Sequence, residues 1–125
     1  MHAKKLSVEE VLLKYSNHPD FIGVELLHVN QSGATDDCPL HIAARRGSLQ
    51  DVLELIALGA NVNLAGDLGN TPLHFAAMAG HINIVEALLV KGASQHARNE
   101  FDQTPAKVAQ LGGRDEVFQF LNRRK

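Results

Sequence analysis

The sequence TPLHFAA at residues 71–77 decides the fold because it recurs at a fixed distance. It is present 33 residues earlier as CPLHIAA at residues 38–44, and 33 residues later in the weaker form TPAKVAQ at residues 104–110. A period of this length is typical of proteins built from stacked structural repeats. Other positions keep the same offset: Gly47 with Gly80 and Gly113, Val52 with Val85 and Phe118, Leu55 with Leu88 and Leu121, and Gly59-Ala60 with Gly92-Ala93.

Each repeat carries the signals of a short helix. A Thr before a Pro offers a side-chain oxygen to the free amides of a helix start, and proline fits the first helical position because its missing N–H has no partner there. We therefore expect helices to begin at Pro39, Pro72 and Pro105. The glycine eight residues after each proline can take the left-handed conformation that ends a helix, so this first helix should be about two turns long.

A second helix is predicted after each of these glycines. Apolar residues follow at helical spacing, which favours a helix with one buried face. They are Leu49, Val52, Leu55 and Ile56 after Gly47, and Ile82, Ile84, Val85, Leu88 and Leu89 after Gly80. Gly59 and Gly92 should end these helices, and the polar stretches 61–70 and 94–103 should form extended loops with a tight turn.

These motifs resemble the ankyrin repeat, whose 33-residue period they share. The resemblance implies an all-α solenoid in which each repeat is a β-turn finger followed by two antiparallel helices, with one continuous core. We expect a single domain over residues 1–125, with full repeats at 38–70 and 71–103. Residues 104–125 should form a C-terminal capping repeat, and residues 5–37 a degenerate N-terminal one.

The N-terminal repeat and the finger turns depart from the family pattern. Residues 5–37 lack the Thr-Pro start, and we expect them to form two helices, Ser7 to Tyr15 and Pro19 to Leu27. Asp36 and Asp102 replace the glycine of the finger turn, while Gly66 replaces the usual aspartate. Because aspartate takes a left-handed turn less readily than glycine, the first finger in particular should differ in shape.

Composition limits the functional classes. Twelve Lys and Arg against fourteen Asp and Glu give a formal charge of −2, so no large positive field attracts nucleic acid. Apolar runs fall far short of the roughly 20 residues that cross a bilayer, and we expect no membrane association. The single cysteine, Cys38, excludes an internal disulfide. The start of the chain also lacks an apolar secretion signal, and together these features favour the cytoplasm.

Residues that could carry chemistry have a simpler structural interpretation. Seven histidines are present, but His41 and His74 occupy the same repeat position, where the family's histidine bonds neighbouring backbone and the Thr hydroxyl. No paired spacing such as H-x-x-x-H accompanies them, so we expect neither a metal nor a cofactor. Cys38 could be a reactive thiol at a helix start, although a buried capping role fits it better. We expect no enzymatic activity.

The resemblance implies a protein partner on the concave face formed by the fingers and first helices. In the fingers, the predicted contact residues are Asp37, Asp67, Leu68, Asn70, Arg98, Glu100, Phe101 and Gln103. On the helices they are Arg45, Arg46, Met78 and Leu111. Leu68, Met78, Phe101 and Leu111 are the candidate apolar anchors.

Three alternatives remain open from the sequence. One is an inhibitor or immunity-type protein that blocks a partner enzyme. Another is an enzyme with a site between the N-terminal helices and the fingers, which no reactive constellation supports. The third is a self-associating scaffold, which would need an apolar face on the last helix, where Val117, Phe118, Phe120 and Leu121 lie. We expect a monomer.

Overall fold

The chain forms a helical solenoid in which three pairs of antiparallel helices are stacked in sequence order. The computed structural model describes residues 8–22, 26 and 28–124. The first helices of the pairs, called the inner helices here, are α2 (Pro39–Arg46), α4 (Pro72–Ala79) and α6 (Pro105–Leu111). The second helices, called the outer helices, are α3 (Leu49–Ala57), α5 (Ile82–Val90) and α7 (Asp115–Arg123). No strand occurs in the described ranges, and the all-α expectation is confirmed.

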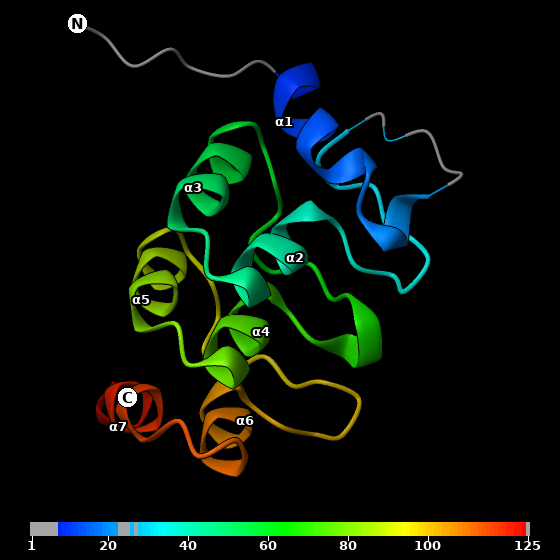
Figure 1. Ribbon diagram of the computed structural model, residues 1–125. Helices are drawn as coiled ribbons and strands as arrows, with labels where there is room; N and C mark the ends of the chain where they lie inside the picture. Colours follow the sequence, from blue (N-terminus) through cyan, green and yellow to red (C-terminus); the bar gives the residue numbers. More distant parts are fainter. Residues whose placement is uncertain (1–7, 23–25, 27, 125) are drawn as a thin grey trace, which may run out of the picture.

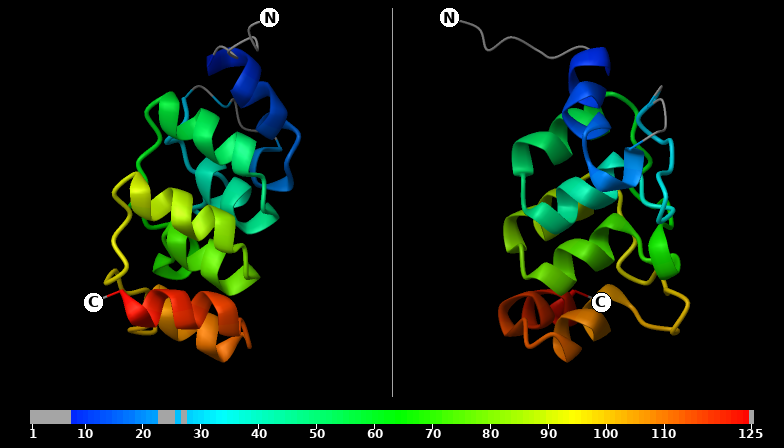
Figure 2. Two further views of the ribbon diagram at one scale, coloured as in Figure 1. Left: turned by 90° about the vertical axis from the view of Figure 1, so that its left-hand side faces the viewer. Right: turned by 45° about the vertical axis from the view of Figure 1, so that its right-hand side comes forward.

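The helices form two layers, with loops on one side. Figure 1 shows the inner helices lying between the outer helices and three loops, the fingers, at residues 28–37, 61–70 and 94–103. The inner helices pack against one another in the order α2, α4, α6, and each also packs against its own outer helix. The outer helices are stacked in the same order (Figure 2, left). The core therefore runs through all the repeats.

The helix starts and ends follow the local signals. All three inner helices begin at the predicted prolines. Thr71 caps α4, where its hydroxyl accepts a hydrogen bond from the backbone N–H of His74. Gly47 and Gly80 end α2 and α4 with φ of 84° and 80°, in the left-handed region that glycine adopts without steric cost. Helix positions were predictable here because the capping chemistry is local.

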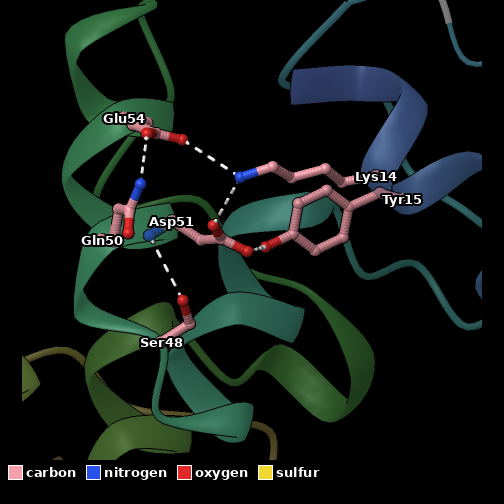
Figure 3. Close-up of polar contacts among 6 residues, drawn as sticks. All are labelled: Lys14, Tyr15, Ser48, Gln50, Asp51 and Glu54. Carbon is pink, nitrogen blue, oxygen red and sulfur yellow. Dashed lines mark hydrogen bonds and ion pairs between the residues drawn. The ribbon is translucent and has the colours of Figure 1, made fainter. Parts of the chain in front are cut away.

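Helix α1 (Val8–Ser16) covers the N-terminal end of the stack by packing against α3. Val11, Leu12 and Tyr15 are buried on its inward face. The Tyr15 hydroxyl donates to Oδ2 of Asp51 at 2.6 Å, and Lys14 Nζ lies 3.1 Å from Oδ1 of the same carboxylate (Figure 3). Burial, reinforced by the Asp51 carboxylate, raises the pKa of Tyr15. The hydroxyl is therefore a neutral donor.

Tyr15→Phe should lower the free energy of unfolding by about 1.5 kcal/mol, because it removes a partly buried hydrogen bond to a charged acceptor. Lys14→Ala is the matched control. It removes the ion pair to the same carboxylate from a side chain that is 39% exposed, and such surface pairs contribute less than about 1 kcal/mol. Urea unfolding of both variants checks the expectation. An equal loss for the two would contradict the assignment of the hydroxyl as the main contact.

The prediction of a second N-terminal helix from Pro19 to Leu27 is wrong. In the described part of that range the chain forms the 3-10 turn η1 (Pro19–Phe21), and Ile22 has extended backbone angles, so an α-helix does not continue through it. Residues 23–25 and 27, like Ser7 of the first predicted helix, lie outside the described residues. The carbonyl of Asp20 accepts from the backbone N–H of Ala34 at 2.8 Å. A continuing α-helix would need that carbonyl for its own ladder, so the tertiary contact with the first finger prevails.

The fingers differ in shape, but it is the second finger that differs, and not the first as predicted. Asp36 and Asp102 both take the left-handed conformation, with φ of 69° and 60°, so the first and third fingers turn alike. In the second finger Gly69 is left-handed at the same repeat position, with φ of 76°, but it ends the short 3-10 turn η2 (Asp67–Gly69), in which Leu68 also has a positive φ, of 55°. A left-handed leucine is strained by roughly 1–2 kcal/mol. The second finger therefore holds an apolar side chain in a conformation that its neighbours do not share.

Candidate functional site

The predicted contact residues fall on one side of the molecule, which we call the finger–helix face. It consists of the finger tips and the exposed sides of the inner helices (Figure 1). Nine of the predicted side chains are exposed or partly exposed there on α2, α4, α6 and the second and third fingers: Arg45, Arg46, Asp67, Leu68, Met78, Arg98, Glu100, Phe101 and Leu111. Gln103 is half-buried at the base of the third finger.

Two predicted contact residues are buried instead. The side chain of Asp37 is only 1% exposed, and Asn70 is 5% exposed. They stand at the same repeat position, and each bonds to the following finger. Oδ1 of Asp37 accepts from the backbone N–H of Asp67 at 2.8 Å, and Oδ1 of Asn70 accepts from Nδ2 of Asn99 at 3.0 Å. Both side chains connect neighbouring fingers and are withdrawn from the surface.

One carboxylate oxygen of Asp37, Oδ2, has no hydrogen-bond partner among the described residues. Its Oδ2 lies 3.7 Å from Nη2 of Arg45, too far for a hydrogen bond, and finds no other partner in the described part of the chain. Burial raises the pKa of this carboxyl, while the Asp67 amide and Arg45 oppose the shift. A Cβ on Gly66 would come within 2.4 Å of Oδ1 of Asp37, which explains the glycine at that position.

Arg45 is held in place on the face. Its guanidinium lies over the Phe75 ring, with Cζ 5.0 Å from the ring centroid, in addition to the ion pair with Asp37. The side chain is nevertheless 45% exposed. An arginine supported by an aromatic ring and a carboxylate loses less conformational freedom when it binds a partner.

Asn99 is a residue of the site that the sequence analysis missed. Its buried Oδ1 accepts from the backbone N–H groups of Phe101, at 2.9 Å, and Gln103, at 3.0 Å. These bonds form an Asx-type turn that fixes the third finger and positions Phe101 at its tip. The sequence feature that could have revealed Asn99 is its repeat position, because glycine stands there in the other two fingers, as Gly33 and Gly66.

The four apolar anchor candidates are all exposed. Leu111 is 62% exposed, Phe101 61%, Leu68 47% and Met78 39%. The other large exposed apolar side chains in the described residues lie on α1, after η1, or on the outer helices: Leu13, Ile22, Leu53 and Val90. The finger–helix face thus gathers half of them on neighbouring repeats.

His41 and His74 connect the inner helices α2 and α4 to the finger that follows each of them. Nε2 of His41 lies 2.6 Å from the carbonyl of Leu64, and Nε2 of His74 lies 2.8 Å from that of Gln103. Because a carbonyl only accepts, Nε2 carries the hydrogen and Nδ1 accepts from the backbone N–H of residue 38 or 71, at 3.0 Å in each case. Nδ1 of His74 also lies 2.8 Å from the Thr71 hydroxyl.

Burial lowers the pKa of both histidines, so both are neutral. The expected structural role is therefore confirmed. Among the residues that the structure describes, no group of three or more His, Cys, Asp or Glu side chains is placed to hold a metal ion.

Cys38 is fully buried at the start of α2, with its Sγ 3.1 Å from Nδ1 of His41. Burial raises the pKa of the thiol, which favours the unreactive protonated form.

Cys38→Thr should raise the free energy of unfolding by about 1 kcal/mol, because a hydroxyl caps a helix better than a thiol. The backbone angles of Cys38 match those of Thr71, the capping residue at the same position of the next repeat, so the threonine should fit without strain. Thermal unfolding followed by circular dichroism checks this result. An unchanged or lower melting temperature would contradict it.

Comparison with known proteins identifies the family. A family model that describes ankyrin repeats (3 copies) matches residues 13–99 and 40–124, which together span most of the chain. Among curated proteins, no sequence matches. Within the described ranges, no helix has the length and hydropathy that a membrane span requires. The helical stack, the histidine contacts to each following finger and the match to the family model agree, and the chain belongs to the ankyrin-repeat family.

Proposed function

We propose that the chain binds a protein partner through its finger–helix face and has no catalytic activity of its own. Ankyrin repeats are generally protein–protein interaction modules, and the family is typically non-catalytic. The observation that carries the proposal is the exposure of Leu68, Met78, Phe101 and Leu111 on this one face. Burying each such side chain at an interface stabilises a complex by roughly 1.5–3 kcal/mol by area, and a few of them dominate binding.

The fixed backbone of the face supports this role. The third finger is organised by Asn99, and the second and third fingers are joined by a hydrogen bond from the Glu100 N–H to the Leu68 carbonyl, at 2.9 Å. Arg45 is held over Phe75. A surface whose anchors are already positioned loses less conformational entropy on binding than a flexible one.

The C-terminal end of the stack is suited to water rather than to another copy. Exposed Lys107, Gln110 and Asn122 stand at the repeat positions that hold His74, Ala77 and Leu89 in the preceding repeat. Phe118 and Phe120 of the last helix are half-buried, and Val117 and Leu121 are buried. The exposed apolar face that a self-associating scaffold would need on α7 is therefore missing from the described residues. These features favour a monomer with a capping repeat at residues 104–125.

Affinity capture from the source lysate tests the proposal. The triple variant Leu68→Ala/Met78→Ala/Phe101→Ala removes three anchors, and Leu53→Ala/Val90→Ala is the matched control because it removes exposed apolar side chains from the outer helices. Circular dichroism verifies that both variants fold. We expect the wild type and the control to retain one partner that the triple variant loses. Equal retention by the triple variant would place the interface elsewhere.

The identity of the captured protein distinguishes a blocking role from a simple binding role. A captured enzyme whose turnover falls when the wild-type chain is added would make the chain an inhibitor.

A further inference from the structure

Equivalent positions of successive repeats form rows across the finger–helix face. The first row consists of Arg45, Met78 and Leu111 near the ends of the inner helices. The carbonyl of Arg45 lies 3.0 Å from Nε2 of His81, and the carbonyl of Met78 accepts from Nε of Arg114 at 3.1 Å. The same contact at both positions shows that they occupy the same place in successive repeats.

A second row runs along the fingers and consists of Thr35, Leu68 and Phe101. The Thr35 hydroxyl donates to the carboxylate of Asp20 and so leaves a polar surface at the N-terminal end of the row. Leu68 and Phe101 are apolar and exposed. Both rows therefore change from polar to apolar in the same direction, towards the C-terminal repeats.

The polar end of the inner row is positively charged. Arg45 and its exposed neighbour Arg46 lie at the end of α2, and the three inner helices contain no Asp or Glu. Asp37 neutralises part of the Arg45 charge, but its side chain is only 1% exposed, whereas that of Arg45 is 45% exposed. An approaching partner therefore contacts the guanidinium and not the carboxylate, and the guanidinium retains free donors for a carboxylate of the partner.

The carboxylates of the face lie on the fingers. Asp36, Asp67, Glu100 and Asp102 are there, with Asp102 in an ion pair with Arg98 at 3.4 Å. These charges disfavour an acidic group placed on the fingers. An acidic group of the partner is therefore more stable beside Arg45 and Arg46 at the end of α2, which sets the direction in which a partner segment lies.

Resting on the proposed function, we infer that the bound segment of the partner protein is polarised along its length. One end carries an Asp or Glu side chain that binds Arg45 and Arg46. The other end carries large apolar side chains that pack on Leu111 and Phe101. With about 8–10 Å between packed helices, the two ends are roughly 20 Å apart. An extended segment covers that distance in about six residues.

Selection from a displayed library of random peptides tests this inference. The probes are peptides of about 12 residues, which reach about 20 Å whether extended or largely helical. Peptides enriched on the immobilised wild-type chain should carry an acidic residue on one side of an apolar pair, and their affinity should fall with salt. Arg45→Gln/Arg46→Gln should weaken them at least about tenfold, because it removes both charges that pair with the acidic residue.

A second variant covers the possibility that loss of Arg45 disturbs α2. Arg46→Glu leaves the contacts of Arg45 with Asp37 and Phe75 intact. Selection on this variant should shift the charged end of the enriched peptides from acidic towards neutral or basic residues.

The results distinguish a failure of the polarised segment from a failure of the proposed face. One set of results would contradict the polarised segment but not the proposed face. In that case the peptides bind the triple anchor variant more weakly than the wild type, yet they lack an acidic end or bind the arginine variants as tightly as the wild type. Peptides that bind the triple anchor variant as well as the wild type would overturn the proposed face itself. A selection that enriches no peptide would also count against a linear polarised segment.

Discussion

His74→Ala should lower the free energy of unfolding by about 3 kcal/mol, because it leaves buried polar groups without partners. The histidine is fully buried and bonds to the backbone N–H of Thr71 and to the carbonyl of Gln103. Alanine removes both bonds at once and leaves a cavity at the contact between α4 and the third finger. Urea unfolding followed by circular dichroism measures the shift of the transition midpoint at constant slope.

The last repeat offers a matched control for this prediction. Lys107 occupies the same repeat position in α6 but is exposed. Lys107→Ala should change stability by less than about 0.5 kcal/mol, as most surface substitutions do. A loss of less than about 1 kcal/mol for His74→Ala would contradict the claim that this histidine holds successive repeats together.

Leu88→Ala should lower the free energy of unfolding by about 2–5 kcal/mol, which is the usual range for a buried leucine replaced by alanine. Leu88 is fully buried on α5, the outer helix that packs against α3 and α7. A cavity there weakens the core in the middle of the stack and its contacts with both neighbouring repeats. Stability in such solenoids depends on the interfaces between neighbouring repeats, so the substitution should lower the urea midpoint for unfolding of the whole chain.

Val90→Ala, two residues along the same helix, is the control because Val90 is 81% exposed. It should cost less than about 0.5 kcal/mol in the same urea unfolding experiment. Similar losses of unfolding free energy for Leu88→Ala and Val90→Ala would contradict the claim that α5 stabilises the chain through its buried side chains.

The sequence predicts the inner helices accurately because their determinants are local. Thr71 and Pro72 start α4, and Gly80 ends it, within one stretch of chain. The second N-terminal helix fails for the opposite reason. The carbonyl of Asp20 bonds to Ala34 in the first finger, and this contact between distant residues outweighs the local pattern.

The candidate site was predictable by position but not by side-chain direction. The repeat alignment places Asp37 and Asn70 in the fingers, where the structure has them, yet both point into the contact with the next finger. Whether a finger residue faces water depends on the neighbouring finger, which spacing along one chain does not reveal. The left-handed conformation of Leu68 was likewise unpredicted, because no local rule favours it for leucine.

Site-specific photocrosslinking tests the central claim most directly, because it reports which face contacts the partner without weakening the contact. A photoreactive phenylalanine analogue replaces Phe101 in one variant and Val90 in the other. Both side chains are exposed, at 61% and 81%, so neither replacement should disturb the fold. Irradiation in the source lysate should yield a covalent adduct with one partner from position 101 and none from position 90. An adduct from position 90 alone, or no adduct from position 101, would contradict binding through the finger–helix face.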